Sequence, residues 1–134
     1  MEISINYLAV IIAAIANMAI GSLWYGPVFG KKWMTLMGFT KESIKNMPLK
    51  PMHAMIGGTL LSLFIAYVMA HFIGIVENAG FSGYQLGFWV WLGFAVPTVA
   101  HGFLWEGKPF ALFILNAAYL LIAYLVMGAI IASL

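Results

Sequence analysis

Four long apolar stretches limit what this chain can fold into more than any other feature of the sequence. They cover residues 5–25, 52–76, 84–104 and 109–133, with polar breaks between them. A helix of about 21 to 25 residues, rising 1.5 Å per residue, crosses a hydrocarbon core of roughly 30 Å. Backbone groups in lipid must be paired within the segment, and the stretches lack the alternation of barrel strands. Each stretch is therefore predicted to be a transmembrane helix.

The composition agrees with a protein that lives in a membrane. Of 134 residues, 64% are hydrophobic and 7% are charged, whereas soluble domains carry about 25% charged residues. A soluble chain of this size would lack the polar surface to cover its core. No polar segment is long enough for a second domain. We therefore expect residues 1–134 to form one all-α domain, an up-down-up-down bundle of four transmembrane helices.

The lysines predict the orientation of the bundle. The loop between the first two stretches carries five of the six lysines and only one acid, whereas the second loop carries only an acid, Glu77. Because lysine-rich loops stay in the cytoplasm, the first and third loops are predicted to lie on the cytoplasmic side of the cell membrane. Both termini are predicted to lie on its outer side. Topology accounts for this lysine cluster, so nucleic acid is not an expected partner. The five lysines are Lys31, Lys32, Lys41, Lys45 and Lys50.

The first cytoplasmic loop has structure of its own in this interpretation. Gly26 and Pro27 are expected to break the first helix, and residues 30–37 are expected to form a short interfacial helix that stops at Gly38. Thr40 is expected to cap a further short helix that ends before Pro48. Aromatic side chains at the helix ends are expected to anchor the bundle at the membrane surface. These anchors are Trp24, Tyr25, Trp33 and Trp105.

Four polar side chains, one from each helix, lie at similar depths of roughly 9 to 12 Å from the cytoplasmic end. They are Asn17, Thr59, Thr98 and Asn116. They either join the helices by hydrogen bonds or form the floor of a polar pocket open to the cytoplasm. Pro97 is expected to kink its helix, and the Asn116 amide is placed to donate to backbone groups freed by that kink. Tyr119 is expected to be packed with its hydroxyl bonded to backbone.

A shallower group contains His53, His101 and Glu106, at the ends of different helices. Such side chains can act as acid and base or bind a divalent metal, but their spacing matches no known motif. The chain has no cysteine, which excludes thiolate chemistry. We therefore expect no cofactor, no metal and no catalytic residue, and include the three residues only as part of the polar pocket.

Small residues recur at every fourth position on the first two helices. These stripes let two helix backbones approach closely, either inside one protomer or between protomers. The first helix carries Ala9, Ala13, Asn17 and Gly21, and the second carries Ala54, Gly58, Ser62, Ala66 and Ala70.

Several motifs resemble the membrane proteins grouped as domain of unknown function 1761. They are Asn-Tyr-Leu-Ala-Val at 6–10, Trp-Tyr-Gly-Pro-Val-Phe-Gly-Lys-Lys-Trp-Met at 24–34, Gly-Phe-Trp-Val-Trp-Leu-Gly-Phe at 87–94, Trp-Glu-Gly-Lys-Pro at 105–109 and Phe-Ile-Leu-Asn-Ala-Ala-Tyr at 113–119. The resemblance implies a compact four-helix membrane protein of bacteria or archaea and no established activity. The residues aligned with the family motifs are Trp24, Tyr25, Pro27, Gly30, Trp33, Trp91, Glu106 and Asn116.

Three functions remain open from the sequence. The first is a non-enzymatic, self-associating membrane component that binds or passes a small solute or lipid through the cytoplasmic-side polar pocket. The second is a membrane enzyme that acts on a lipid-soluble substrate with His101 and Glu106. The third is a membrane protein that binds a divalent metal through His53, His101 and Glu106.

Overall fold

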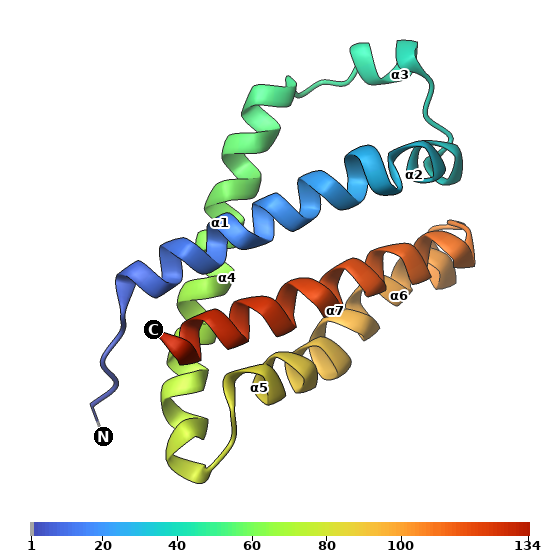
Figure 1. Cartoon of the computed structure of the whole chain (residues 1–134). Helices are drawn as coiled ribbons and strands as arrows, with labels where there is room; N and C mark the ends of the chain where they lie inside the picture. Colours follow the sequence, from blue (N-terminus) through green and yellow to red (C-terminus); the bar gives the residue numbers. More distant parts are fainter. Residues whose placement is uncertain (1) are drawn as a thin grey trace.

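The computed structural model describes residues 2–134, and all the regular structure in this range is helical (Figure 1). Four segments are long and apolar enough to cross a membrane: Tyr7–Val28, Pro51–Ala79, Gly83–Trp105 and Phe110–Ser133. The predicted all-α fold with four such helices is confirmed. The elements in order are α1 (Tyr7–Leu23), η1 (Trp24–Val28), α2 (Gly30–Met37), α3 (Lys41–Lys45), α4 (Pro51–Val76), η2 (Glu77–Ala79), α5 (Gly83–Val90), η3 (Trp91–Ala95), α6 (Val96–Trp105) and α7 (Phe110–Ser133).

Asn6 caps the start of helix α1 and also forms a hydrogen bond with the end of α7. The Oδ1 atom of Asn6 accepts from the backbone N–H groups of Leu8 and Ala9 at 3.1 and 3.2 Å, as an N-cap does. Its Nδ2 atom donates to the carbonyl oxygen of Leu134 at 2.9 Å. The first turn of α1 therefore lies beside the last turn of α7, and the two helices run antiparallel (Figure 1).

The small-residue stripes pack inside the protomer. Ala9, Ala13 and Asn17 on α1 are buried, as are Ser62, Ala66 and Ala70 on α4. A side chain at Gly58 would meet Met18 of α1 at 3.5 Å, and one at Gly21 would meet the hydroxyl of Tyr119 at 3.1 Å. Ala54, the first residue of the α4 stripe, is exposed and takes no part. The close α1–α4 approach that the sequence predicts is thus formed within one chain.

The backbones of α5 and α7 approach each other very closely, a contact that the sequence analysis did not single out. A Cβ atom at Gly87 would lie 2.4 Å from the carbonyl oxygen of Tyr124, and one at Gly83 would lie 2.1 Å from that of Gly128. Gly83 and Gly87 form a G-x-x-x-G pair, the spacing that favours such contacts between membrane helices. That spacing was the available signal.

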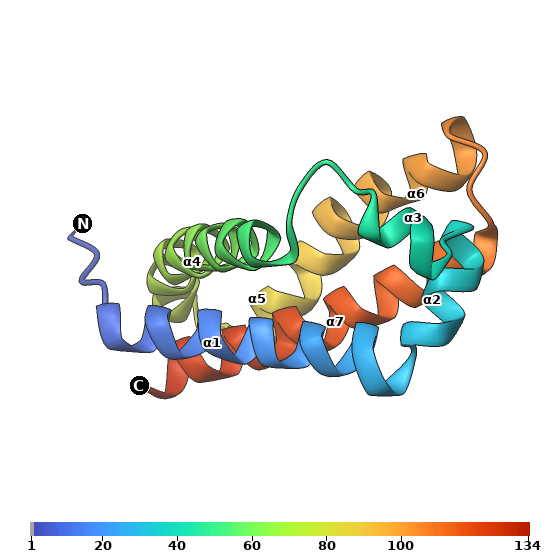
Figure 2. The same cartoon turned by 90° about the horizontal axis from the view of Figure 1, so that it is seen from above.

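Helix α4 crosses the other long helices at a steep angle, and its first half extends away from them (Figures 1 and 2). Its second half packs against α1 and α7 through Met69 and Ile73, which are buried. The first half presents large apolar side chains to the surroundings. Among these are Met52, Met55, Ile56, Leu60 and Leu61, each at least 53% exposed.

Candidate functional site

The chain turns sharply where the first apolar segment ends. Gly26 has φ −108° and ψ −106°, which interrupts the helix within η1 immediately before Pro27. The N–H group of Phe29 reaches back to the carbonyl oxygen of Trp24 at 2.8 Å. The predicted break is confirmed. The turn that follows it places α2 in contact with the first half of α7.

The two short helices of the loop also match the sequence. α2 spans Gly30–Met37 and ends at Gly38, whose φ of +73° suits glycine. Thr40 caps α3 and forms a reciprocal capping box with Ser43. α3 ends at Lys45, before Pro48. We call residues 29–50 the lysine loop.

Tyr25 and Asn116 form a hydrogen bond that joins η1 to α7. The Tyr25 hydroxyl donates to the Oδ1 atom of Asn116 at 2.6 Å, and both residues are half-buried. The Tyr25 ring also packs edge-on against Trp33 of α2 and Tyr119 of α7, with centroids 5.8 and 5.3 Å apart. The three aromatic rings and the amide therefore form one cluster at the lysine-loop end of the bundle.

A second set of hydrogen bonds joins three helices next to this cluster. The Nδ2 atom of Asn17 donates to the hydroxyl of Ser62 at 2.8 Å, and the Tyr119 hydroxyl donates to the Oδ1 atom of Asn17 at 2.5 Å. Asn17 and Ser62 are 7% and 3% exposed, so their polar atoms need these partners. We call Asn17, Tyr25, Ser62, Asn116 and Tyr119 the polar network.

Two tryptophans fix the turn of α7 that carries Asn116. The indole N–H of Trp24 donates to the carbonyl oxygen of Leu115 at 3.2 Å, and that of Trp91 donates to Ala117 at 2.8 Å. Trp91 is the first residue of the π-helical turn η3, and Trp24 is the first residue of η1, where the helix is interrupted at Gly26. The two indoles bond to the residues directly before and directly after Asn116.

A pocket of about 310 Å³, the tyrosine pocket, opens beside the aromatic cluster. Its wall is formed by Tyr25, Trp33, Val99, Asn116, Tyr119 and Leu120. The Oδ1 atom of Asn116 is used by Tyr25. Within residues 2–134, the Nδ2 group of Asn116 has no hydrogen-bond partner. The pocket therefore combines aromatic walls with one available amide donor.

The structure joins two of the four predicted deep polar residues. Asn17 and Asn116 are connected through Tyr119 and Tyr25, the second of which the sequence analysis treated only as an anchor. Thr59 and Thr98 instead donate to their own helices, to the carbonyl oxygens of Met55 at 2.8 Å and Phe94 at 2.5 Å. Both threonines are exposed.

The two threonines line depressions other than the tyrosine pocket. Thr59 lines a depression between α1 and α4 together with Ser22, and Thr98 lines one between α6 and α7. A helix fixes the depth of a residue but not its direction around the helix axis, which is why matched depth did not produce one chamber.

One expectation about hydrogen bonds is wrong, and another is confirmed in part. The Asn116 side chain does not repair the kink at Pro97 in the described chain; its partner is Tyr25. The segment around Pro97 is instead a π-helical turn, η3, followed by α6, and the Trp91 indole ties it to α7. The Tyr119 hydroxyl bonds to a side chain, Asn17, and reaches the backbone oxygen of that residue at 3.4 Å.

The shallower predicted group is not assembled. His53, His101 and Glu106 are all exposed. Across residues 2–134, no three histidine or carboxylate side chains come together so that they could hold a metal ion. Of the four predicted anchors, Trp105 is 82% exposed. Trp24, Tyr25 and Trp33 are half-buried against their neighbours.

Comparison with known proteins gives a family and no activity. No curated protein and no solved structure is significantly similar to the chain. The family described as protein of unknown function (DUF1761) matches residues 8–132, which include all four long apolar segments up to their terminal residues. The chain belongs to the family of proteins of unknown function DUF1761.

Proposed function

We propose that the protein is a multi-pass component of the cell membrane that binds a small solute or lipid in the tyrosine pocket. In this proposal the lysine loop lies in the cytoplasm and both termini lie outside. The four apolar segments support membrane insertion. The pocket lies at the lysine-loop end of the bundle, so its ligand would be bound near the inner membrane surface.

The observation that carries the proposal is the state of the Asn116 amide. Its oxygen is bonded to Tyr25, its Nδ2 group has no hydrogen-bond partner among the described residues, and Asn116 lines a pocket with mainly apolar walls. A polar group in such surroundings is stabilised by a hydrogen-bond partner. A ligand with an acceptor oxygen, such as a carbonyl, ester or phosphate oxygen, would supply one.

The walls of the pocket favour a ligand that also has an apolar part. Trp33, Tyr25 and Tyr119 present aromatic surface, and Val99 and Leu120 present aliphatic surface. A mostly apolar pocket with one convergent polar group is typical of small-molecule sites, and about 310 Å³ is at the small end of their range. The expected ligand is therefore amphipathic.

Native mass spectrometry of the protein released from lipid nanodiscs tests this proposal. We would prepare nanodiscs of phosphatidylethanolamine and phosphatidylglycerol and count the molecules that stay bound. The wild type is expected to retain one lipid or one co-purified small molecule. The Asn116→Leu variant is expected to retain about tenfold less, because it removes the donor from an apolar site. A wild type that retains nothing would refute the proposal.

The matched control is Asn46→Leu, the same chemical change at an exposed position in the lysine loop. It is expected to retain as much as the wild type. Equal loss in both variants would indicate a general effect on folding, and equal retention in both would remove Asn116 from the site.

We also propose that the protein self-associates through the first half of α4. Large apolar side chains there are exposed, and a side chain added at Gly57 would meet nothing within 4 Å. A second helix could approach this surface closely. Light scattering of the detergent-solubilised protein tests self-association, and a strictly monomeric mass would contradict it. Disulfide cross-linking of a Gly57→Cys variant then tests the surface, because the native chain has no cysteine.

A further inference from the structure

Three neighbouring pockets along α7 are linked in order by shared lining residues. The tyrosine pocket shares Val99 and Leu120 with a second pocket of about 270 Å³. The second pocket shares Tyr124 with a third of about 190 Å³. We call the second and third pockets together the tail groove.

One face of α7 forms the floor of this path. Asn116, Leu120 and Tyr124 are spaced four residues apart, so they follow one another along the same side of the helix. Eight residues at 1.5 Å per residue give a length of about 12 Å between the first and the last. A single hydrocarbon chain, and not a compact solute, fits a narrow path of this kind.

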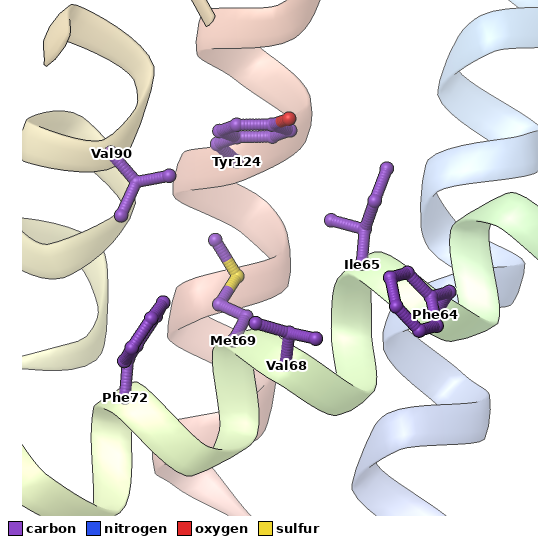
Figure 3. Close-up of a pocket in the computed structure, with 7 residues that line it drawn as sticks. All are labelled: Phe64, Ile65, Val68, Met69, Phe72, Val90 and Tyr124. Atoms are coloured by element: carbon purple, nitrogen blue, oxygen red, sulfur yellow. The ribbon is translucent and has the colours of Figure 1, made fainter. Parts of the chain in front are cut away.

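The far end of the groove lies between α4, α5 and α7. Figure 3 shows Val90 from α5 and Tyr124 from α7 on one side, and Ile65, Met69 and Phe72 from α4 on the other. Met69 is 4% exposed and Phe72 is 48% exposed, so the wall extends from the packed interior to the outer surface.

The far end of the path is the least polar part. The tyrosine pocket is lined by Asn116 and two tyrosines. The second pocket is also partly polar and is lined by Thr98, whose hydroxyl bonds to the carbonyl oxygen of Phe94 on its own helix. The third pocket is almost entirely aliphatic and aromatic. This arrangement matches a lipid with its headgroup at Asn116 and the end of one chain in the third pocket.

Positive charge is concentrated at the polar end. Lys31 and Lys32 lie two and one residues before Trp33, a wall residue of the tyrosine pocket, and so project from other sides of the same short helix. The ammonium group of Lys108 lies 4.0 Å from the sulfur of Met37 at the other end of that helix. No carboxylate pairs with these three lysines in the part of the chain that the structure describes. An anionic headgroup complements this surface.

We propose that the tail groove holds one acyl chain of an anionic phospholipid whose headgroup is bound at the tyrosine pocket. This inference rests on the proposed function and names the class of its ligand. The groove distinguishes the bound lipid from the surrounding bilayer, because its chain would reach Ala95 and Met69, the two lining residues that are buried.

Photo-cross-linking in nanodiscs tests the inference directly. The probe is a phosphatidylglycerol with a diazirine in the middle of one acyl chain, and the labelled positions are mapped by mass spectrometry. Labels are expected to concentrate on Val99, Leu120 and Tyr124. Labelling that is equally strong at Ile122, on an exposed part of α7, would overturn the inference. The same chain on phosphatidylcholine is expected to label the groove less, and equal labelling by the two lipids would refute the anionic preference.

A variant that narrows the groove separates this inference from the proposed function. Leu120→Phe enlarges a residue shared by the first two pockets and is expected to reduce labelling at Tyr124 by about fivefold or more. Ile122→Phe is the matched control and is expected to leave labelling unchanged. Val99→Phe narrows the same place from α6, so it serves where Leu120→Phe does not fold.

The experiments distinguish a failure of the tail-groove inference from a failure of the proposed function. If the wild type retains a ligand by native mass spectrometry but both narrowing variants keep full labelling at Tyr124, the tail groove is refuted and the tyrosine pocket stands. If the wild type retains no ligand, both proposals fail together.

Discussion

Trp24 and Trp91 hold the same turn of α7, although they lie 67 positions apart in the sequence. Their indole N–H groups donate to the carbonyl oxygens of Leu115 and Ala117, at 3.2 and 2.8 Å. Both carbonyls belong to residues adjacent to Asn116. The segments η1 and η3 thus meet α7 where the polar network and the tyrosine pocket meet, and the position of Asn116 depends on both.

Replacing Trp91 by phenylalanine should weaken this arrangement. The variant keeps an aromatic ring but removes the donor to Ala117. We expect the free energy of unfolding to fall by about 1 kcal/mol, the size of a typical hydrogen bond between membrane helices. Reversible unfolding in mixed detergent and dodecyl sulfate micelles measures it. Trp89→Phe is the control, since Trp89 is 58% exposed, and a loss as large as that of Trp91→Phe would contradict the explanation.

The hydrogen bond between Tyr25 and Asn116 should appear as an interaction energy. Tyr25→Phe and Asn116→Ala each remove one partner of the 2.6 Å contact. In a double-mutant cycle we expect the two effects on the free energy of unfolding to be non-additive by about 0.6 to 1.7 kcal/mol. The combination of Tyr25→Phe with Thr59→Ala is expected to be additive, because Thr59 bonds only to Met55 in the described residues. Additive behaviour of the Tyr25–Asn116 pair would argue against the contact.

The α5–α7 contact should not tolerate a methyl group. A Cβ atom at Gly87 would lie 2.4 Å from the carbonyl oxygen of Tyr124, so Gly87→Ala must push the two helices apart. We expect a loss of about 1 to 3 kcal/mol in the free energy of unfolding, as for other overpacked interiors. At Gly93 an added Cβ meets nothing within 4 Å. Gly93→Ala should therefore be neutral or slightly stabilising, and equal losses at the two sites would refute the close approach.

Cysteine labelling should place the lysine loop on the cytoplasmic side. The native chain contains no cysteine, so single substitutions report one site each. A Lys45→Cys variant is expected to react with a membrane-impermeant maleimide only in inside-out vesicles. A Gly80→Cys variant, in the loop between α4 and α5, is expected to react only in spheroplasts, whose membrane keeps its original orientation. The reverse pattern would overturn the predicted orientation.

The sequence alone determined the helices and most of their boundaries. Hydropathy is a local property that adds up along the chain, so 24 successive residues such as Phe110–Ser133 define a long apolar helix without knowledge of any partner. The break at Gly26 and Pro27, the stop at Gly38 and the cap at Thr40 also depend on single residues and their immediate neighbours. For the same reason the small-residue stripe on α1 identified the face that packs.

Only the tertiary structure decided which polar groups meet. Asn17 and Asn116 were expected to share a layer with Thr59 and Thr98, but depth along an axis does not fix the direction of a side chain around it. The Tyr25–Asn116 bond joins residues 91 apart, and the Tyr119–Asn17 bond joins residues 102 apart. Their formation depends on the crossing of α4, the turn in η1 and the glycine contact between α5 and α7. Those are relations between helices, which no single stretch of sequence contains.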